Sequence, residues 1–349
     1  FEDLTLELSG RGPSEVAAVL TVTPERVVCF DVAAQTGAGV GGGWVALGLR
    51  GGRLGMARSD GAARRVIALD GLQSVAAAPV VASGRVFFVS NESTIECVPC
   101  EEGVDAGYWP VALGDEAATP LIAAGGRLLI VDSAECLRCW EQETGRELWR
   151  VDLGASPSGP PTVSRRAVYV GTTDGRVQVF DLADGAKRGG VRGPAAVTTR
   201  VHVCDDHIVF GCADGAVRRV DVVSGDVLWE RQFDAVLDDA GLAVTGERCC
   251  VAARGGVMVC SNSSGEVLGQ LLERVEIVAM QSRGEQVLAR VRRAAGDAVG
   301  ARDVTVSLDA ASLNVSWEYP LPAGAPGWIG VDELTLAIPT PDGRVVFIR

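Results

Sequence analysis

Two Cys-x-x-Cys pairs are the residues whose types and spacing most directly suggest chemistry. They are Cys97 with Cys100 and Cys136 with Cys139, and four thiolates form the ligand set of a tetrahedral structural zinc site. Both pairs fall on or just after an apolar run that predicts a β-strand, and residues i and i+3 of a strand point to opposite faces. We therefore predict buried structural cysteines, with zinc binding as the alternative.

Other residues with chemical potential are few. Cys249 and Cys250 are adjacent, but they lie inside a predicted strand, residues 248–253, where core filling is favoured. The two histidines, His202 and His207, are too few for a His-rich metal site or a relay of several histidines, and we expect His207 to be a surface residue. No P-loop, Rossmann fingerprint or Gly-x-Ser-x-Gly motif occurs. We predict no catalytic residue, no metal and no cofactor.

An arginine-rich insertion is the candidate partner-binding segment. It spans residues 290–302 and contains Arg290, Arg292, Arg293 and Arg302. Arginine offers a bidentate fork to carboxylates, so a loop of this composition in an acidic protein could bind an acidic partner segment. The alternative is a solvated loop at a hairpin tip.

Composition limits the class of protein. The 349 residues carry a net charge of −13, whereas nucleic-acid binding requires a basic surface. We therefore predict that the protein does not bind nucleic acid. Ten cysteines without a disulfide framework favour a reducing compartment, so we predict a cytoplasmic location. No apolar run is long enough to span a membrane, and no signal segment opens the chain. Because the chain begins at Phe1, we expect it to be part of a longer protein.

A repeat of about forty residues indicates the architecture. Eight units share a β-branched run, a short turn and a second apolar run; they begin near Trp44, Arg85, Arg127, Ala167, His207, Arg248, Gln286 and Thr335. Turns such as Asp174-Gly175 and Asp342-Gly343 are hairpin signals, because glycine readily supplies the positive φ that these turns need. Each unit therefore contains a β-hairpin.

Flanking segments extend each hairpin to four strands. A small residue and proline precede several hairpins, as at Ala78-Pro79, and an outer strand such as residues 147–153 follows. Four antiparallel strands per unit describe a propeller blade. We predict an all-β, eight-bladed β-propeller over residues 1–349 as one domain. Its last unit lacks an outer strand, so we expect the N-terminal strand, residues 4–8, to join the last blade and close the ring.

These phrases resemble the pyrroloquinoline-quinone-like (quinoprotein-like) propeller repeat. The fourth unit carries residues 168–175 (VYVGTTDG) and 180–185 (FDLADG), and the fifth carries Gly225 followed by Trp229. In that family a tryptophan of the outer strand packs between neighbouring blades. The resemblance implies this structural role for Trp109, Trp149, Trp229 and Trp317. Gly189 and Gly269 stand where tryptophan is expected, so other residues must fill those two junctions.

The resemblance also suggests functions. We predict a non-enzymatic interaction or regulatory module, which binds a protein or a neighbouring domain and is the C-terminal propeller of a cytosolic acyl-activating protein related to aminoadipate-semialdehyde dehydrogenase. One alternative is a periplasmic scaffold similar to the outer-membrane assembly propeller lipoprotein. Another is a quinoprotein oxidoreductase that binds pyrroloquinoline quinone and calcium, in which a vicinal pair such as Cys249-Cys250 lies beside the quinone.

Overall fold

The computed structural model describes residues 20–21, 25–69, 73–103, 109–235, 237–238, 240–254, 256–273, 275–293, 303–321, 330–331 and 336–348. These residues form strands and turns, with no helix among them. Consequently, no helix in the described part of the chain has the length and apolar character needed to cross a membrane.

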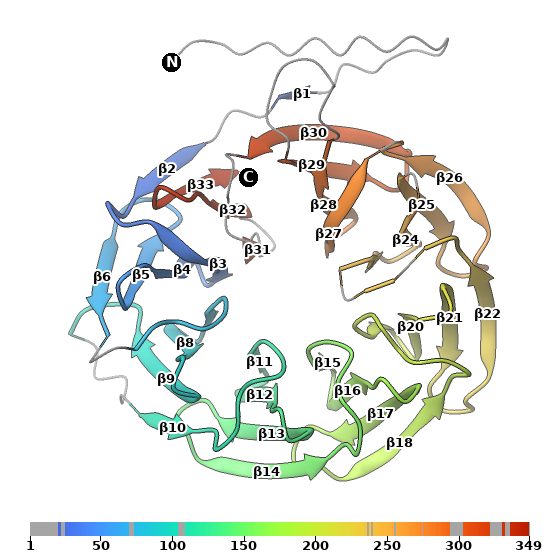
Figure 1. The fold of residues 1–349 in the computed structure, drawn as a ribbon, viewed down its shortest axis with the longest axis horizontal. Helices are drawn as coiled ribbons and strands as arrows, with labels where there is room; N and C mark the ends of the chain where they lie inside the picture. The colour runs from blue at the N-terminus through green and yellow to red at the C-terminus, as the bar shows by residue number, and fades with distance from the viewer. Residues whose placement is uncertain are drawn as a thin grey trace.

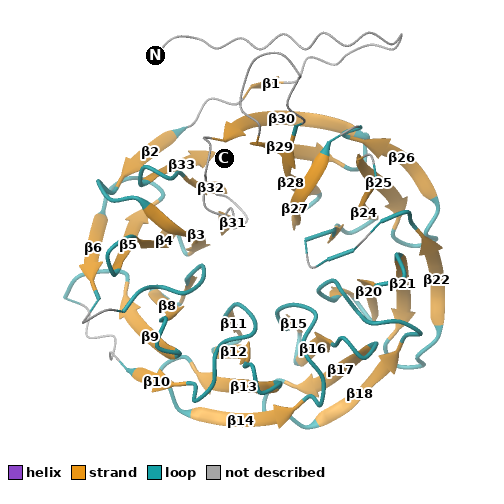
Figure 2. Cartoon of the chain, viewed as in Figure 1, coloured by secondary structure: helices purple, strands orange, loops and turns teal. Residues whose placement is uncertain are grey.

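The strands form eight sheets arranged in a ring, each with four antiparallel strands, and one of them carries a fifth, parallel strand (Figures 1 and 2). Blade one contains β3 (Ala34–Gly41), β4 (Trp44–Leu49), β5 (Arg53–Arg58) and β6 (Arg64–Ala68), and blade two contains β7 (Val80–Ala82), β8 (Arg85–Val89), β9 (Thr94–Pro99) and β10 (Pro110–Ala112). Blade three contains β11 (Ile122–Ala124), β12 (Arg127–Val131), β13 (Cys136–Glu141) and β14 (Glu147–Asp152), and blade four contains β15 (Thr162–Ser164), β16 (Ala167–Gly171), β17 (Arg176–Asp181) and β18 (Lys187–Arg192).

The second half of the chain continues the same order. Blade five contains β19 (His202–Cys204), β20 (His207–Gly211), β21 (Ala216–Asp221) and β22 (Val227–Gln232), and blade six contains β23 (Leu242–Val244), β24 (Arg248–Ala253), β25 (Gly256–Ser261) and β26 (Val267–Leu271). Blade seven contains β27 (Glu276–Arg283), β28 (Gln286–Arg292), β29 (Asp303–Asp309) and β30 (Asn314–Leu321), and blade eight contains β31 (Gly330–Val331), β32 (Leu336–Pro339), β33 (Arg344–Ile348) and β2 (Arg26–Cys29). The predicted eight-bladed architecture is confirmed.

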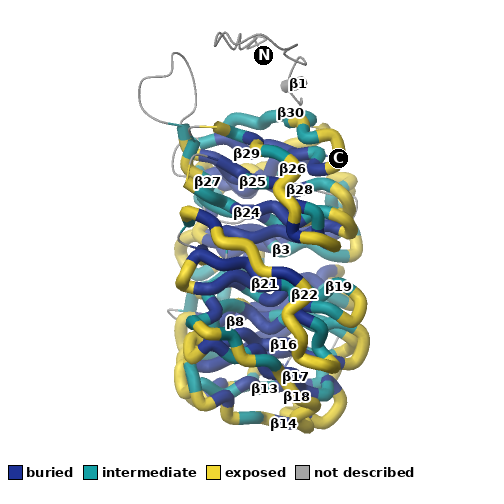
Figure 3. The backbone as a smooth tube through the Cα atoms, turned by 90° about the vertical axis from the view of Figure 1, so that its right-hand side faces the viewer, coloured by how far each residue is buried: buried dark blue, intermediate teal, exposed yellow. Residues whose placement is uncertain are grey.

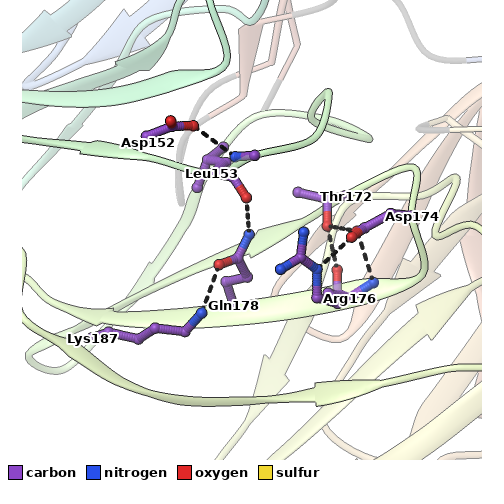
Figure 4. Close-up of polar contacts among 8 residues, drawn as sticks. Asp152, Leu153, Thr172, Asp174, Arg176, Gln178 and Lys187 are labelled. Atoms are coloured by element: carbon purple, nitrogen blue, oxygen red, sulfur yellow. Dashed lines mark hydrogen bonds and ion pairs between the residues drawn. The ribbon is translucent and has the colours of Figure 1, made fainter.

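The hairpin turns follow the chemistry that the Asp-Gly pairs predict. In blade four the Thr172 hydroxyl donates to the Asp174 carboxylate at 2.7 Å, and Arg176 forms an ion pair with the same carboxylate (Figure 4). Gly175 has a φ of 86°, and a Cβ there would lie 2.8 Å from the Ala195 carbonyl oxygen. Glycine is therefore required at this position for both its conformation and its size.

A strand near the N-terminus closes the ring by joining the last blade, as predicted, but it is not the strand that we expected. The strand that pairs with β33 is β2, with Arg26 opposite Phe347; residues 4–8, the segment we expected, lie outside the described residues. A further short strand, β1 (Leu20–Thr21), runs parallel to β30 with Leu20 opposite Trp317. Blade seven therefore accepts a fifth strand on its outer edge, which the repeat pattern did not predict.

Tryptophans of the outer strands join neighbouring blades, as the resemblance implied. The Trp149 indole N–H donates to the Leu182 carbonyl of blade four at 3.1 Å, and the Trp229 N–H donates to the Asn262 carbonyl of blade six at 2.7 Å. Each ring lies over a turn glycine, because a Cβ on Gly185 or on Gly265 would come within 2.7 Å of it. We call this arrangement the indole–glycine contact.

Two more tryptophans serve the same purpose. Trp109 lies over the turn glycine Gly145 of blade three, and Trp317 packs against an apolar cluster that includes Leu336 and Ile338 of blade eight. The structural role that the resemblance implied for all four outer-strand tryptophans is therefore confirmed.

Three junctions use other residues in place of the indole. Arg65 of blade one donates to the Cys100 carbonyl at 3.2 Å, the type of acceptor that Trp149 and Trp229 use. The Arg26 side chain lies against Gly61 of blade one. At the junction of blades six and seven the sizes are exchanged, since Leu313 takes the turn position and packs against Gly269 of the outer strand.

The indole–glycine contact predicts a difference between two alanine substitutions. Gly185 and Gly225 have similar φ values, 73° and 78°, so both substitutions bear the same left-handed backbone cost of about 1–2 kcal/mol. Only Gly185→Ala also drives a methyl group into Trp149, so it should lower the free energy of unfolding by about 1–3 kcal/mol more. Urea unfolding of the two variants measures this difference, and equal losses would contradict the packing role.

Candidate protein-interaction site

The candidate arginines lie at one end of blade seven. Arg290 and Arg292 belong to strand β28, and Arg293 follows directly, whereas Arg302 lies outside the described residues. The prediction that Arg290 and Arg292 lie on a loop was wrong. Alternating apolar residues, among them Ala289 and Val291, are fully buried and extend the strand into the segment taken for an insertion.

Each of these arginines pairs with a carboxylate from another strand of blade seven. Arg290 and Arg292 both bind Asp303, at 2.9 and 3.1 Å, and Arg292 also reaches Glu276 at 3.2 Å. Arg293 binds Glu318 at 2.7 Å. The structure therefore brings the three described arginines together and balances their charge within the blade.

The electrostatics of the cluster follow from these pairs. Burial alone would raise the pKa of Asp303, but hydrogen bonds from Arg290 and Arg292 outweigh it and hold that pKa below its ordinary value. The hydrogen bond to Asp303 raises the pKa of Arg292. Arg292 keeps 46% of its side chain exposed, against 10% for Arg290. Arg292 is thus the member of the cluster best placed to meet a partner carboxylate, and partner binding there stays a prediction.

The Cys-x-x-Cys residues occupy apolar positions. Cys97, Cys100 and Cys139 are buried, whereas Cys136 is partly exposed. Cys97 and Cys139 take equivalent places on β9 and β13, as the repeat predicted. Desolvation raises the pKa of Cys97 and Cys100 to about 11 and that of Cys139 to about 12. In the described part of the chain no group of His, Cys, Asp and Glu side chains is arranged to hold a metal ion.

The adjacent cysteines of blade six point to opposite faces of their strand. Cys249 packs into the cluster between blades five and six, with Trp229 among its members, and Cys250 packs between blades six and seven. Both thiols are free and fully buried, and desolvation raises the pKa of both, to about 12 for Cys250. The predicted core-filling role is confirmed.

The histidines have structural surroundings. His202 Nε2 lies 3.1 Å from the Leu242 carbonyl of the next blade. His207 begins β20 with 29% of its side chain exposed, 3.8 Å from Asp221. The expected surface position of His207 is therefore only partly met.

One small cavity lies between the segments that lead into blades two and three. It has a volume of 230 Å³ and is lined mainly by alanine, valine and leucine side chains, with Thr119 among them. The Thr119 hydroxyl already accepts the Val131 amide at 3.0 Å. The lining therefore offers apolar contact rather than recognition of a charged ligand.

These features define the class of protein as an all-β, eight-bladed β-propeller whose surface carries paired charges. Residues 105–236 match the family described as "Outer membrane protein assembly factor BamB", which supports the pyrroloquinoline-quinone-like repeat seen in the sequence. A curated relative, the outer membrane protein assembly factor BamB of Moranella endobia (strain PCIT), is 23% identical over 173 residues. That alignment covers 44% of this chain and 44% of the relative.

Solved structures of diverse proteins share the fold. BamB from Moraxella catarrhalis superposes with a TM-score of 0.70 at 14% identity, covering 93% of this chain and 98% of its own. The computationally designed Ika8 protein gives 0.68 at 16% identity, with coverages of 91% and 96%. Sqt1 of Saccharomyces cerevisiae gives 0.69 at 10% identity, with coverages of 95% and 98%. At these identities the likeness concerns the fold alone.

The burial of the thiols predicts their order of reactivity. Cys29 is exposed and should be alkylated first by iodoacetamide at neutral pH. A pKa of about 11, as for Cys97, leaves about a hundredfold less thiolate than in an ordinary cysteine, so the buried thiols should react only after unfolding. Peptide mass spectrometry over time measures this order. Labelling of Cys97 or Cys139 as fast as Cys29 would contradict the packing.

The Asp303 pairs predict a pH-dependent stability difference. Because the folded-state pKa is lowered, the ionised group stabilises the fold above its unfolded pKa of about 3.9, and this is lost as the pH falls through the folded value. Asp303→Asn should therefore cost about 2–4 kcal/mol at pH 7, and this cost should shrink steadily as the pH falls below about 3.9 and through the lower folded-state pKa. Denaturant titration at several pH values measures the difference. Asp205→Asn, at a 91% exposed side chain, is the control.

Proposed function

We propose that this propeller is a non-enzymatic scaffold that binds a protein partner during the assembly of outer membrane proteins. The observation that carries the proposal is the match of residues 105–236 to the outer membrane protein assembly factor family. The relative from Moranella endobia and the propeller from Moraxella catarrhalis agree with it. A protein scaffold also suits the chemistry found, because the described arginines of blade seven form ion pairs with carboxylates of the same blade.

The partner-binding part of the proposal is the arginine cluster of blade seven. Arg292 is exposed, and an acidic partner segment could replace Glu276, whose side chain is 63% exposed, at its guanidinium. Exchange of one carboxylate for another costs little, since the hydrogen bonds are replaced in kind. Arg293, 25% exposed in its pair with Glu318, lies next to Arg292 in the chain and is the second arginine that a partner could reach.

The comparisons do not support the cytoplasmic location predicted from the ten cysteines. An oxidising compartment is compatible with these thiols, because most are buried and burial raises the pKa of Cys97, Cys100 and Cys139. A thiol held away from its thiolate form is slow to form disulfides. We therefore propose a periplasmic location, which suits outer-membrane assembly. The prediction that the propeller is one domain of a longer protein stays a prediction.

The two other predicted functions gain no support. None of the relatives named above is an acyl-activating protein or a quinoprotein oxidoreductase. Their supporting feature, the propeller repeat, is shared equally by the scaffold that we propose.

Charge reversal tests the proposed surface. Arg292→Glu should reduce capture of envelope proteins by the immobilised propeller by at least about tenfold, because like charges would then face the acidic partner. Arg165→Glu, at a 68% exposed ion pair between blade four and Asp206 of blade five, is the matched control and should leave capture unchanged. Equal capture by wild type and the Arg292 variant would overturn the arginine surface. Failure of wild type to capture any assembly component would overturn the scaffold function.

A further inference from the structure

The junction between blades four and five lacks the residue that joins its neighbours. Gly189 of β18 lies opposite Val179, in the register at which Trp149 lies opposite Cys139 and Trp229 opposite Arg219. A Cβ on Gly189 would meet nothing within 4 Å. The position that carries an indole in blades three and five is therefore open in blade four.

The receiving turn of blade five is uncovered as a result. The turn glycines under the three indoles, Gly145, Gly185 and Gly265, are all buried, whereas Gly225 is exposed. A Cβ on Gly225 would also meet nothing within 4 Å. Val222, whose equivalent Leu182 accepts the Trp149 N–H, is only partly buried.

Exposed apolar side chains surround this open position. Val223 has 89% and Val227 has 55% of its surface exposed. Lys187, the equivalent of Val227 in blade four, bonds to Gln178, whose amide reaches the Leu153 carbonyl of the preceding blade (Figure 4). Val227 therefore faces blade four. We call Gly189, Val222, Val223, Gly225 and Val227 the blade-five slot.

No other junction in the described part of the chain lacks both the indole on the outer strand and a side chain that replaces it over the next turn. Where the outer strand of blade six has Gly269, Leu313 of the next blade fills the space. Where blades one and eight lack tryptophan, Arg65 and Arg26 reach the neighbouring turn. The blade-five slot therefore has the backbone of an indole-binding turn, but no described residue of the chain places a side chain in it.

We propose that the blade-five slot binds a tryptophan side chain from an extended, acidic segment of a partner protein. The indole would lie over Gly225 and donate its N–H to the Val222 carbonyl, as Trp149 and Trp229 do over their own turns. This inference rests on the proposed scaffold function only in taking a protein as the partner. It uses a face separate from the arginine cluster.

The outer edge of blade four suits such a segment. Strand β18 is an exposed edge, as the side view shows (Figure 3), and blade seven already accepts a fifth strand, β1, opposite the tryptophan position of β30. Strand addition would therefore bring a partner residue beside Gly189. The edge carries Lys187, Arg188 and Arg192 and no acidic residue. Two copies of this edge would repel each other, whereas an acidic segment would be attracted.

A synthetic peptide tests the slot. The probe copies residues 146–153, the strand that carries Trp149, with both arginines replaced by glutamate and a fluorophore at one end. Fluorescence anisotropy with the full chain should show saturable binding, and replacing the peptide tryptophan by alanine should weaken it at least about tenfold. A Kd weaker than about 1 mM for the tryptophan peptide would overturn the proposal.

Matched variants locate the binding. Val227→Asp places a carboxylate in the slot and should weaken binding at least about tenfold. Val267→Asp is the control, because Val267 holds the equivalent place, 45% exposed, at the junction that Trp229 already fills. Equal affinities of the two variants, at matched melting temperatures, would overturn the assignment to this slot. If self-association of the propeller displaces the peptide, a second copy of this chain occupies the slot, and the proposal of a different partner protein is overturned. Loss of envelope capture by Arg292→Glu with intact peptide binding would separate the two surfaces.

Discussion

The contact of an indole with a turn glycine of the next blade is the interaction on which the ring depends. Each blade is a separate hydrogen-bonded sheet, so neighbouring blades are joined largely by side chains. A tryptophan buries a large apolar area and satisfies its N–H on a backbone carbonyl, as Trp149 and Trp229 do. Glycine is required beneath it, because a Cβ on Gly185 or on Gly265 would enter the ring.

The variations at other junctions keep the same physical requirement. Arg65 reaches the type of carbonyl that the indoles use, and Leu313 with Gly269 exchanges the large and small partners. Two of the cysteines belong to the same packing, since Cys139 lies opposite Trp149 and Cys97 packs in one cluster with Trp109. Most of the residues that first suggested chemistry therefore hold the blades together. The surfaces that we propose for partner binding are the arginine cluster of blade seven and the blade-five slot.

The sequence predicted those parts of the structure that repeat. Trp149, Trp229 and the Asp-Gly turns recur at a constant spacing, which was enough to give eight blades and the role of the tryptophans. Junctions that depart from the repeat could not be predicted, because nothing in the sequence around Arg26 and Arg65 indicates that they replace an indole. The strand at Arg290 and Arg292 was missed for a similar reason: charged residues alternate with buried Ala289 and Val291, and their partners lie on three different strands. The sequence did show that Gly189 and Gly269 lack the indole, but the expectation that other residues fill both junctions was wrong at Gly189 and right only at Gly269, where Leu313 fills the space. That no described residue replaces the indole at Gly189 becomes visible only when the turn that should receive it is seen.

Hydrogen exchange at the receiving turns tests this account most directly. The turn at residues 182–185 lies under Trp149, whereas the equivalent turn at residues 222–225 has no indole above it. The account predicts fast exchange of the second turn in the free propeller and slow exchange of the first, with the second becoming protected when the acidic tryptophan peptide binds. Equal protection of both turns in the free protein, or no change at residues 222–225 on binding, would contradict it.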